Sequence, residues 1–275
     1  MKIFVCYHKK ELVIENDILQ PIQVGSALAK ELFLPLTDNI GDEISALNPY
    51  YSELTAAYWI YKNVQEDIVG LCHYRRFFNF KNEETKIHRI SSDFVQKFGY
   101  EKAHIESLMT DYDLILPTKK GAKKHPVSLY DFYKKEHYIS DLDITLDVIK
   151  EKYPDQYQTA YKTLHQQTKG YYANMLIARK EIFDQAAAWL FDILFEVQKR
   201  IHKDVLKRTP YQQRVYGFIS ERLMSVFVAL HPELRIKEMP CLMIETDEKK
   251  WRKYCLHKFK QKILNLFHIK KDKCA

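Results

Sequence analysis

Glycine is scarce in this sequence: seven of the 275 residues are glycine, and no two of them form a Gly-x-Gly pair. The P-loop and the dinucleotide-binding fingerprint both need closely spaced glycines, because the backbone approaches a phosphate there. The sequence therefore excludes both motifs. Any phosphate that the protein binds is expected to contact side chains instead.

Cysteines are also few, and long apolar runs are missing. The five cysteines are odd in number, widely spaced and without a C-x-x-C pair, which excludes a disulfide framework and a zinc site and favours a reducing cytosol. The apolar run that begins at Ile3 ends at Tyr7, too short for a signal peptide, and no apolar run reaches 18 residues. We expect a cytoplasmic protein that does not cross the membrane by its own sequence.

Positive charge is concentrated at the C-terminus. Residues 249–275 contain ten Lys and Arg and one acid, a balance of +9, so that the overall +7 leaves −2 for residues 1–248. A nucleic-acid-binding domain should carry its positive field over the folded surface. We therefore expect no nucleic-acid partner.

The basic tail, residues 249–275, has an apolar stripe. Cys255, Phe259, Ile263 and Phe267 recur every four residues among lysines, which predicts a basic amphipathic helix. Such a helix is attracted to anionic lipid by about 1 kcal/mol per basic residue, which would place the protein at the inner face of the cytoplasmic membrane. The alternative is a helix that packs on the body with its lysines in solvent.

Strand-length apolar runs alternate with helical patterns through residues 1–248, which we expect to form a single domain. The predicted strands cover residues 2–7, 67–73, 113–116, 172–178 and 234–244. The predicted helices cover residues 53–63, 103–110, 181–201 and 214–230. This alternation indicates an α/β fold, an open sheet flanked by helices, with ligands at the carboxyl ends of its strands. Residues 118–169 are interpreted as a helical insertion over the site, or else as a solvated excursion.

The second predicted strand delivers His73, Tyr74, Arg75 and Arg76 at its carboxyl end. Arginine stays charged and binds phosphate oxygens in bidentate geometry, so this run suits a nucleotide diphosphate. The alternative is that one arginine pairs with a carboxylate of the body while the other is solvated. Tyr7 and His8 follow the first strand and suit stacking on a nucleobase, although a tyrosine at the edge of the core is also expected there.

A polar loop lies between these strands and leads into the helix that begins near Glu53. Its Asp38, Asn39, Asn48 and Glu53 can bind sugar or ribose hydroxyls. Asn and Asp also form turns in loops of every kind, so the residue types alone do not decide.

Five blocks of the sequence resemble a known bacterial family, domain of unknown function 4422. They are residues 21–25, residues 38–55 with Tyr58-Trp59, residues 70–78 around His-Tyr-Arg-Arg, residues 174–175 with 189–195, and residues 214–223. The resemblance covers residues 2 to about 245. Members of this family occur among capsule, exopolysaccharide and O-antigen biosynthesis proteins and are regarded as glycosyltransferases.

The resemblance implies a GT-A-like fold. It also implies transfer of a sugar from a nucleotide donor, here expected to be a UDP-sugar, to a lipid-linked glycan. In some relatives the sugar is galactose or galactofuranose. Most GT-A enzymes place Asp-x-Asp after a central strand to bind a metal, whereas the comparable strand here delivers arginines. Asp111-Tyr112-Asp113 spells the same motif, but it lies at the amino end of the predicted strand 113–116, whereas ligands bind at the carboxyl ends of strands. We expect no protein metal site, with Mn²⁺ or Mg²⁺ left open as a cofactor.

Sugar transfer needs a base and a group that stabilises the leaving diphosphate. Arg75 and Arg76 are expected to stabilise the diphosphate, and Glu221, with Asp42 as runner-up, to act as the base. Glu221 also fits a solvated carboxylate next to arginines. Asn174 is expected to contact the donor, and the acceptor to contact His137, Asp141 and Arg214. A peripheral membrane scaffold without turnover is the alternative function.

Overall fold

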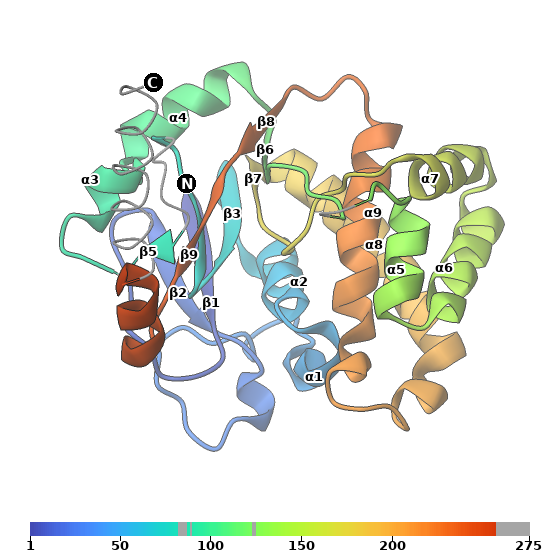
Figure 1. Ribbon diagram of the computed structural model, residues 1–275, viewed down its shortest axis with the longest axis horizontal. Helices are drawn as coiled ribbons and strands as arrows, with labels where there is room; N and C mark the ends of the chain where they lie inside the picture. The colour runs from blue at the N-terminus through green and yellow to red at the C-terminus, as the bar shows by residue number, and fades with distance from the viewer. Residues whose placement is uncertain (82–86, 89, 123–124, 257–275) are drawn as a thin grey trace, which may run out of the picture.

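The computed structural model describes residues 1–81, 87–88, 90–122 and 125–256, and it confirms the predicted α/β class. A mixed sheet lies beside a layer of helices (Figure 1). The strands are β1 (Lys2–Tyr7), β2 (Leu19–Gln23), β3 (Ile68–His73), β4 (Arg76–Phe78), β5 (Ile87–His88), β6 (Leu114–Pro117), β7 (Leu176–Arg179), β8 (Ile236–Met239) and β9 (Cys241–Ile244).

The centre of the sheet has the order β2-β1-β3-β7-β6-β8. β1 runs parallel to β2 and β3, β6 runs parallel to β8, and β7 is antiparallel to both of its neighbours. Every strand of this centre except β7 therefore points the same way. The carboxyl ends of β1 and β3 consequently meet at one edge, where α/β sheets place their ligands. A smaller ribbon of β4, β9 and β5 continues from the end of β3.

Helices cover both faces of the sheet. They are α1 (Asn48–Tyr51), α2 (Leu54–Asn63), α3 (Phe94–Phe98), α4 (Lys102–Asp111), α5 (Leu129–Glu136), α6 (Ile139–Lys152), α7 (Pro154–Gln166), α8 (Lys180–Val205) and α9 (Val215–Leu230). Along β1, Phe4 and Cys6 join the core that α2, α8 and α9 share, whereas Ile3 and Val5 join the core that α3 and α4 share. Burial on both faces explains why the strand is apolar throughout.

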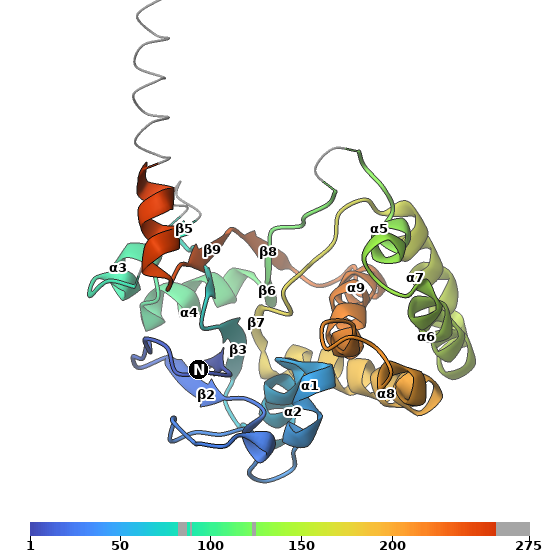
Figure 2. The same cartoon turned by 60° about the horizontal axis from the view of Figure 1, so that its bottom comes forward.

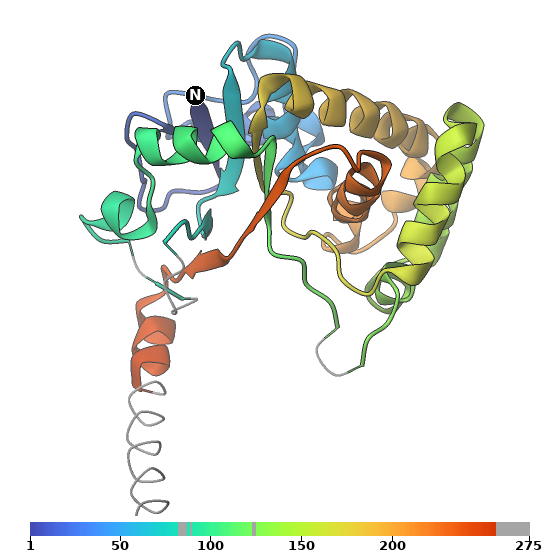
Figure 3. The same cartoon turned by 90° about the horizontal axis from the view of Figure 1, so that it is seen from above.

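The segment 118–169 contains α5, α6 and α7. Helices α6 and α7 pack on α8 and α9, and Figure 2 shows the three helices on the side of α8 and α9 away from the sheet. The last described residues, 248–256, are helical and leave from the β9 end of the sheet, far from α5–α7 (Figure 3). The rest of the predicted amphipathic tail, with Phe259, Ile263 and Phe267, lies outside the described residues.

Most predicted elements are present, and the exceptions have local causes. The strand expected over residues 172–178 begins only at Leu176, because Ala173 and Asn174 have left-handed backbone angles, with φ of 79° and 47°. The strand expected over residues 234–244 is divided into β8 and β9 at Pro240. β2 was not predicted, since Pro21 lies at its centre; it pairs with β1 as an edge strand, where proline is tolerated. Within the described residues, no helix is both long and apolar enough to span a membrane.

Candidate active site

Two adjoining clefts open where β1 and β3 end. The sheet-side cleft has a volume of about 580 Å³, and its walls include His8, His73, Tyr74 and Arg75. The helix-side cleft has a volume of about 400 Å³ and lies against α5 and α9. Both clefts are lined by the same four residues, which we call the junction: Ser52, Glu53, Arg76 and Arg214. A molecule that fills both clefts must pass these four side chains.

The two adjacent arginines of the β3–β4 turn have different surroundings. Arg75 donates from Nε to the Ile244 carbonyl at 3.1 Å and from Nη2 to Glu245 Oε1 at 3.3 Å. Arg76 is exposed, and its guanidinium has no hydrogen bond or ion pair with the described residues. Arg75 is thus partly neutralised, whereas Arg76 presents a full positive charge to the junction.

A second unneutralised cation lines the junction together with Arg76. Arg214 precedes α9, is exposed, and donates from Nε to Ser52 Oγ at 2.9 Å. It forms no ion pair with a carboxylate of the described chain. Two guanidinium groups without acidic partners, at the carboxyl edge of a sheet, favour binding of a multiply charged anion such as a diphosphate.

An aromatic pair, His8 and Tyr74, lines the sheet-side cleft. The rings of His8 and Tyr74 have centroids 5.2 Å apart and meet edge to face. Burial, followed by the charges of Lys9 and Arg214, lowers the pKa of His8, so its ring is neutral at pH 7. Tyr7, in contrast, is fully buried, donates its hydroxyl to the Leu12 carbonyl and does not line the cleft, and burial raises its pKa to about 12. The candidates for contact with a nucleobase are therefore His8 and Tyr74, without Tyr7.

Backbone strain is concentrated around the junction. Ser52, Ala173 and Asn174 are the described non-glycine residues with positive φ, at 53°, 79° and 47°. Such conformations cost about 1–3 kcal/mol each and persist only where the surroundings impose them. Here Ala173 N–H donates to Glu221 Oε1 at 2.8 Å, and its carbonyl accepts from His73 Nε2 at 2.5 Å. The Ala173 peptide is thus held from both sides.

His73 is neutral in this arrangement. Burial lowers its pKa, with Arg76 and Arg214 acting in the same direction and Glu53 opposing them. Because a carbonyl oxygen only accepts hydrogen bonds, the ring proton is assigned to Nε2. His73 is therefore bound to the Ala173 turn rather than available as a cation for phosphate.

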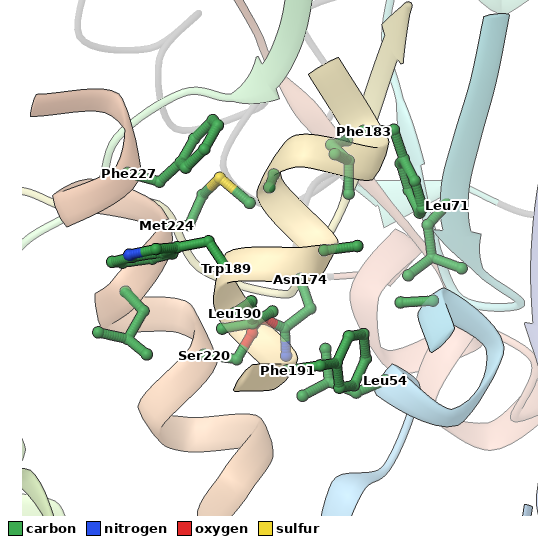
Figure 4. Close-up of a pocket in the computed structure, with 15 residues that line it drawn as sticks. Leu54, Leu71, Asn174, Phe183, Trp189, Leu190, Phe191, Ser220, Met224 and Phe227 are labelled. Atoms are coloured by element: carbon green, nitrogen blue, oxygen red, sulfur yellow. The ribbon is translucent and has the colours of Figure 1, made fainter. Parts of the chain in front are cut away.

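Asn174 uses its whole amide group inside the protein. Its Oδ1 accepts from Ser220 Oγ at 2.9 Å, and its Nδ2 donates to Glu53 Oε1 at 2.8 Å and to the Gly217 carbonyl at 3.2 Å. Figure 4 shows Asn174 and Ser220 at one wall of a small apolar cavity, of about 40 Å³, between α8 and α9. Asn174 lines the helix-side cleft and orients Glu53, and both hydrogens of its amide nitrogen are used inside the protein.

Glu221 lies on α9 in the helix-side cleft. One oxygen accepts from Ala173 N–H, and the other pairs with Arg222 Nη1 at 2.9 Å. Burial raises the pKa of Glu221, against the opposing effects of Arg222 and the Ala173 hydrogen bond. The side chain is half-buried, at 18% exposed, and its carboxylate is bonded at both oxygens, which differs from the solvated alternative considered for it.

The comparisons with known proteins agree with this geometry. The model of the family described as Domain of unknown function (DUF4422) matches residues 2–232, well over half of the chain. The chain belongs to the DUF4422 family. The solved apo structure of WbbM, described as a bifunctional glycosyltransferase, is similar with a TM-score of 0.81 and 31% identity, over 89% of this chain and 45% of that chain. The chain thus spans less than half the length of WbbM. No curated protein matches.

The family match confirms the resemblance noted from the sequence blocks. The residues matched by the family model include all four junction residues and the His73–Arg76 run, whereas the basic C-terminal segment follows the matched region. The matched region therefore contains every residue that lines the helix-side cleft and all that line the sheet-side cleft except Met243.

Three candidates from the polar loop of this DUF4422 chain lie away from the clefts. Asp38 is fully buried and accepts hydrogen bonds from Gly25 N, Ser26 N, Ser45 Oγ and Thr55 Oγ1, so its carboxylate organises the loop and has no free position for a sugar. Neither Asn39 nor Asp42 lines a cleft; Asp42 is exposed and accepts from the Tyr58 hydroxyl at 3.0 Å. An acceptor hydroxyl in the clefts is therefore out of reach of Asp42. Asn48 does line the sheet-side cleft, and its contact with a donor stays a prediction.

The two site candidates from the segment 118–169, His137 and Asp141, lie in different surroundings. His137 lines the helix-side cleft, where its ring stacks on Phe218 with centroids 4.0 Å apart. Asp141 is buried and forms a bidentate ion pair with Arg208, at 2.5 and 2.7 Å, outside the cleft. His137 and Asp141 thus do not act as a pair. Sequence reasoning missed the rings that share this cleft with His137, namely Phe132, Tyr172, Tyr211 and Phe218; nothing in their local pattern separates them from core aromatics.

The described residues do not fit a metal site at the end of β3. Asp113 lies at the amino end of β6 and pairs with Arg235 at 2.7 Å, which lowers the pKa of Asp113 to about 2. In the described part of the chain, no three His, Cys, Asp or Glu side chains are grouped to bind a metal. The groups at the junction that can neutralise a diphosphate are arginines.

Proposed function

We propose that this chain is a glycosyltransferase that moves a sugar from a nucleotide-diphosphate donor, a UDP-sugar, to a growing glycan. The observation that carries the proposal is the pair Arg76 and Arg214, two cations at the junction of the two clefts that form no ion pair with a carboxylate of the described residues. The similarity to WbbM, a bifunctional glycosyltransferase of which this chain matches 45%, supports the same reaction class.

The clefts suit the two substrates separately. The sheet-side cleft offers His8 and Tyr74 for the nucleobase and Arg76 for the diphosphate. The helix-side cleft offers aromatic faces, including Tyr211 and Phe218, and sugar rings stack on aromatic faces in many binding sites. We assign the donor to the sheet-side cleft and the acceptor to the helix-side cleft.

In this reaction the leaving group is a nucleoside diphosphate, whose terminal phosphate gains negative charge as the bond to the sugar breaks. Fixed cations aimed at developing charge lower the barrier, because they need no reorganisation during the reaction. Arg76 and Arg214 supply this stabilisation at the junction, and Arg75 holds the β3–β4 turn against β9.

The cellular setting is part of the proposal. We infer a lipid-linked acceptor in capsule, exopolysaccharide or O-antigen synthesis, with galactose or galactofuranose as the sugar. The +9 charge of residues 249–275 supports attachment to the inner face of the cytoplasmic membrane.

The test is release of UDP from a panel of UDP-sugars by the purified protein, with and without a lipid-linked acceptor. Turnover should fall steeply in Arg76→Ala and stay unchanged in Arg200→Ala, a matched arginine on α8 that pairs with Glu151 and Glu196 and lines neither cleft. If the protein binds anionic vesicles but no nucleotide, the glycosyltransferase proposal is refuted and the alternative, a non-catalytic peripheral membrane scaffold, is supported.

A further inference from the structure

Among the described residues, Glu53 is the carboxylate that lines both clefts. It directly precedes α2 and follows Ser52, whose unusual backbone (φ 53°, ψ −131°) turns the chain into the junction. Of the carboxylates that line the clefts, Glu136 and Glu221 line the helix-side cleft, whereas Glu53 lines both. It therefore lies where donor and acceptor must meet.

The two oxygens of Glu53 have different surroundings. Oε1 accepts from Asn174 Nδ2 at 2.8 Å, and Asn174 is itself fixed by Ser220 and Gly217. Oε2 has no hydrogen bond or ion pair with the described residues. One oxygen thus orients the carboxylate, and the other is available to a substrate hydroxyl.

Glu221, in contrast to Glu53, has a protein partner at each carboxylate oxygen. Both of its oxygens are bonded, and protonation would break its ion pair with Arg222, whose side chain is 3% exposed. Its hydrogen bond instead secures the Ala173 peptide, the neighbour of Asn174. Glu221 therefore fits a positioning residue that acts through the Ala173–Asn174 turn.

We propose that Glu53 is the general base of the transfer, and that Asn174 and Glu221 position it. The assignment rests on the proposed glycosyltransferase function. The proton of the acceptor hydroxyl passes to Glu53 Oε2 as the acceptor oxygen forms a bond to C1 of the donor sugar. The bond from C1 to the diphosphate oxygen breaks, and its electron pair leaves with the diphosphate beside Arg76 and Arg214.

Five charged or titratable groups from other elements surround Glu53: Cys6 of β1, His73 of β3, Arg76 of β4, Arg214 before α9, and Glu221 of α9. Burial raises the pKa of the Cys6 thiol, so Cys6 keeps its proton. The two arginines hold no removable proton near pH 7. His73 is the competing base, since its Nδ1 carries a lone pair, but it lines only the sheet-side cleft. A pH profile must therefore separate Glu53 from His73.

The decisive variant is Glu53→Gln, which keeps the size of the side chain and an oxygen that accepts from Asn174. Positioned proton transfer contributes about 10²- to 10⁴-fold, so the rate of sugar transfer should fall by that factor. The dissociation constant for UDP should change less than about threefold, because the base acts on the acceptor. The acidic limb of the pH–rate profile should disappear, and Glu53→Asp should restore it at a reduced rate.

The matched control is Glu221→Gln, which removes the pairing with Arg222 but should keep the acidic limb. The assignment to Glu53 is overturned if Glu53→Gln transfers sugar within threefold of the wild-type rate, or if the acidic limb is lost in His73→Gln or Glu221→Gln instead. UDP affinity shows whether each variant is folded. If the wild-type protein transfers no sugar, both the proposed function and the assignment of Glu53 as the base are refuted. If the wild type and Glu53→Gln are both active, only the assignment of Glu53 is refuted.

Discussion

Replacing Arg76 by alanine should weaken UDP binding by more than one order of magnitude. The guanidinium is exposed and has no ion pair with the described residues, so none of its interaction with a phosphate is offset by a broken protein contact. A hydrogen bond to a charged group contributes about 1.5–3 kcal/mol. At about 1.4 kcal/mol per tenfold, this corresponds to a loss of about 10- to 150-fold in affinity.

Its neighbour Arg75 supplies the internal control. Arg75 is bonded to Glu245 and to the Ile244 carbonyl, so Arg75→Ala should lower UDP affinity by less than about threefold while loosening the contact between β4 and β9. Arg76→Lys should lie between wild type and Arg76→Ala, because lysine keeps the charge but loses the bidentate geometry.

Isothermal titration of UDP and of uridine into each variant measures the effect. The affinity ratio of UDP to uridine isolates the diphosphate, and this ratio should collapse in Arg76→Ala while uridine binding changes little. A dissociation constant for UDP within twofold of wild type, in a variant with an unchanged melting temperature, would refute the role of Arg76.

Further predictions concern the residues that support the site. Asp38→Asn should destabilise the protein by about 3 kcal/mol or more in urea unfolding, because a buried carboxylate with four donors is lost, whereas exposed Asp42→Asn should change stability by less than about 0.5 kcal/mol. Asp141→Ala should cost about 3–5 kcal/mol by leaving the charge of Arg208 buried and unpaired, and adding Arg208→Met should recover part of the loss. Asp113 has a folded-state pKa of about 2, below the usual value of about 3.9, so its ion pair stabilises the fold above about pH 4 and is lost as the pH falls toward 2. The melting temperature of Asp113→Asn should accordingly lie below wild type at pH 7, with a difference that shrinks below pH 4.

The framework of the fold could be predicted from the sequence because each face of the sheet is covered. β1 and β3 are continuous apolar runs, and α2, α8 and α9 carry apolar residues at helical spacing, so local pattern and global structure agree. The boundaries failed where local geometry overrides pattern, at Pro240 and in the left-handed turn at Ala173.

The edge of the sheet that carries the site was also predictable, since polar residues follow two apolar strands. The roles of single residues were not. Arg75 and Arg76 are adjacent in sequence and equal in chemistry, but Arg75 lies in the turn before β4 and meets Glu245, whereas Arg76 begins β4 and meets no carboxylate of the described residues. In the loop, Asp38 is completely buried whereas the side chain of Asp42 is 58% exposed, a difference that no local pattern encodes.

Glu53 shows the same limit for catalysis. From the sequence it was a candidate for donor contact, and Glu221 was the candidate base. Their difference arises from partners that lie more than 40 residues away in sequence: Asn174 for Glu53, and Ala173 for Glu221.

A crystal structure of the complex with UDP tests the central claim most directly. The account predicts diphosphate oxygens at hydrogen-bond distance, about 2.7–3.0 Å, from the guanidinium groups of Arg76 and Arg214, with the uracil ring beside His8 and Tyr74. A diphosphate bound outside the sheet-side cleft, with Arg76 directed into solvent, would contradict it.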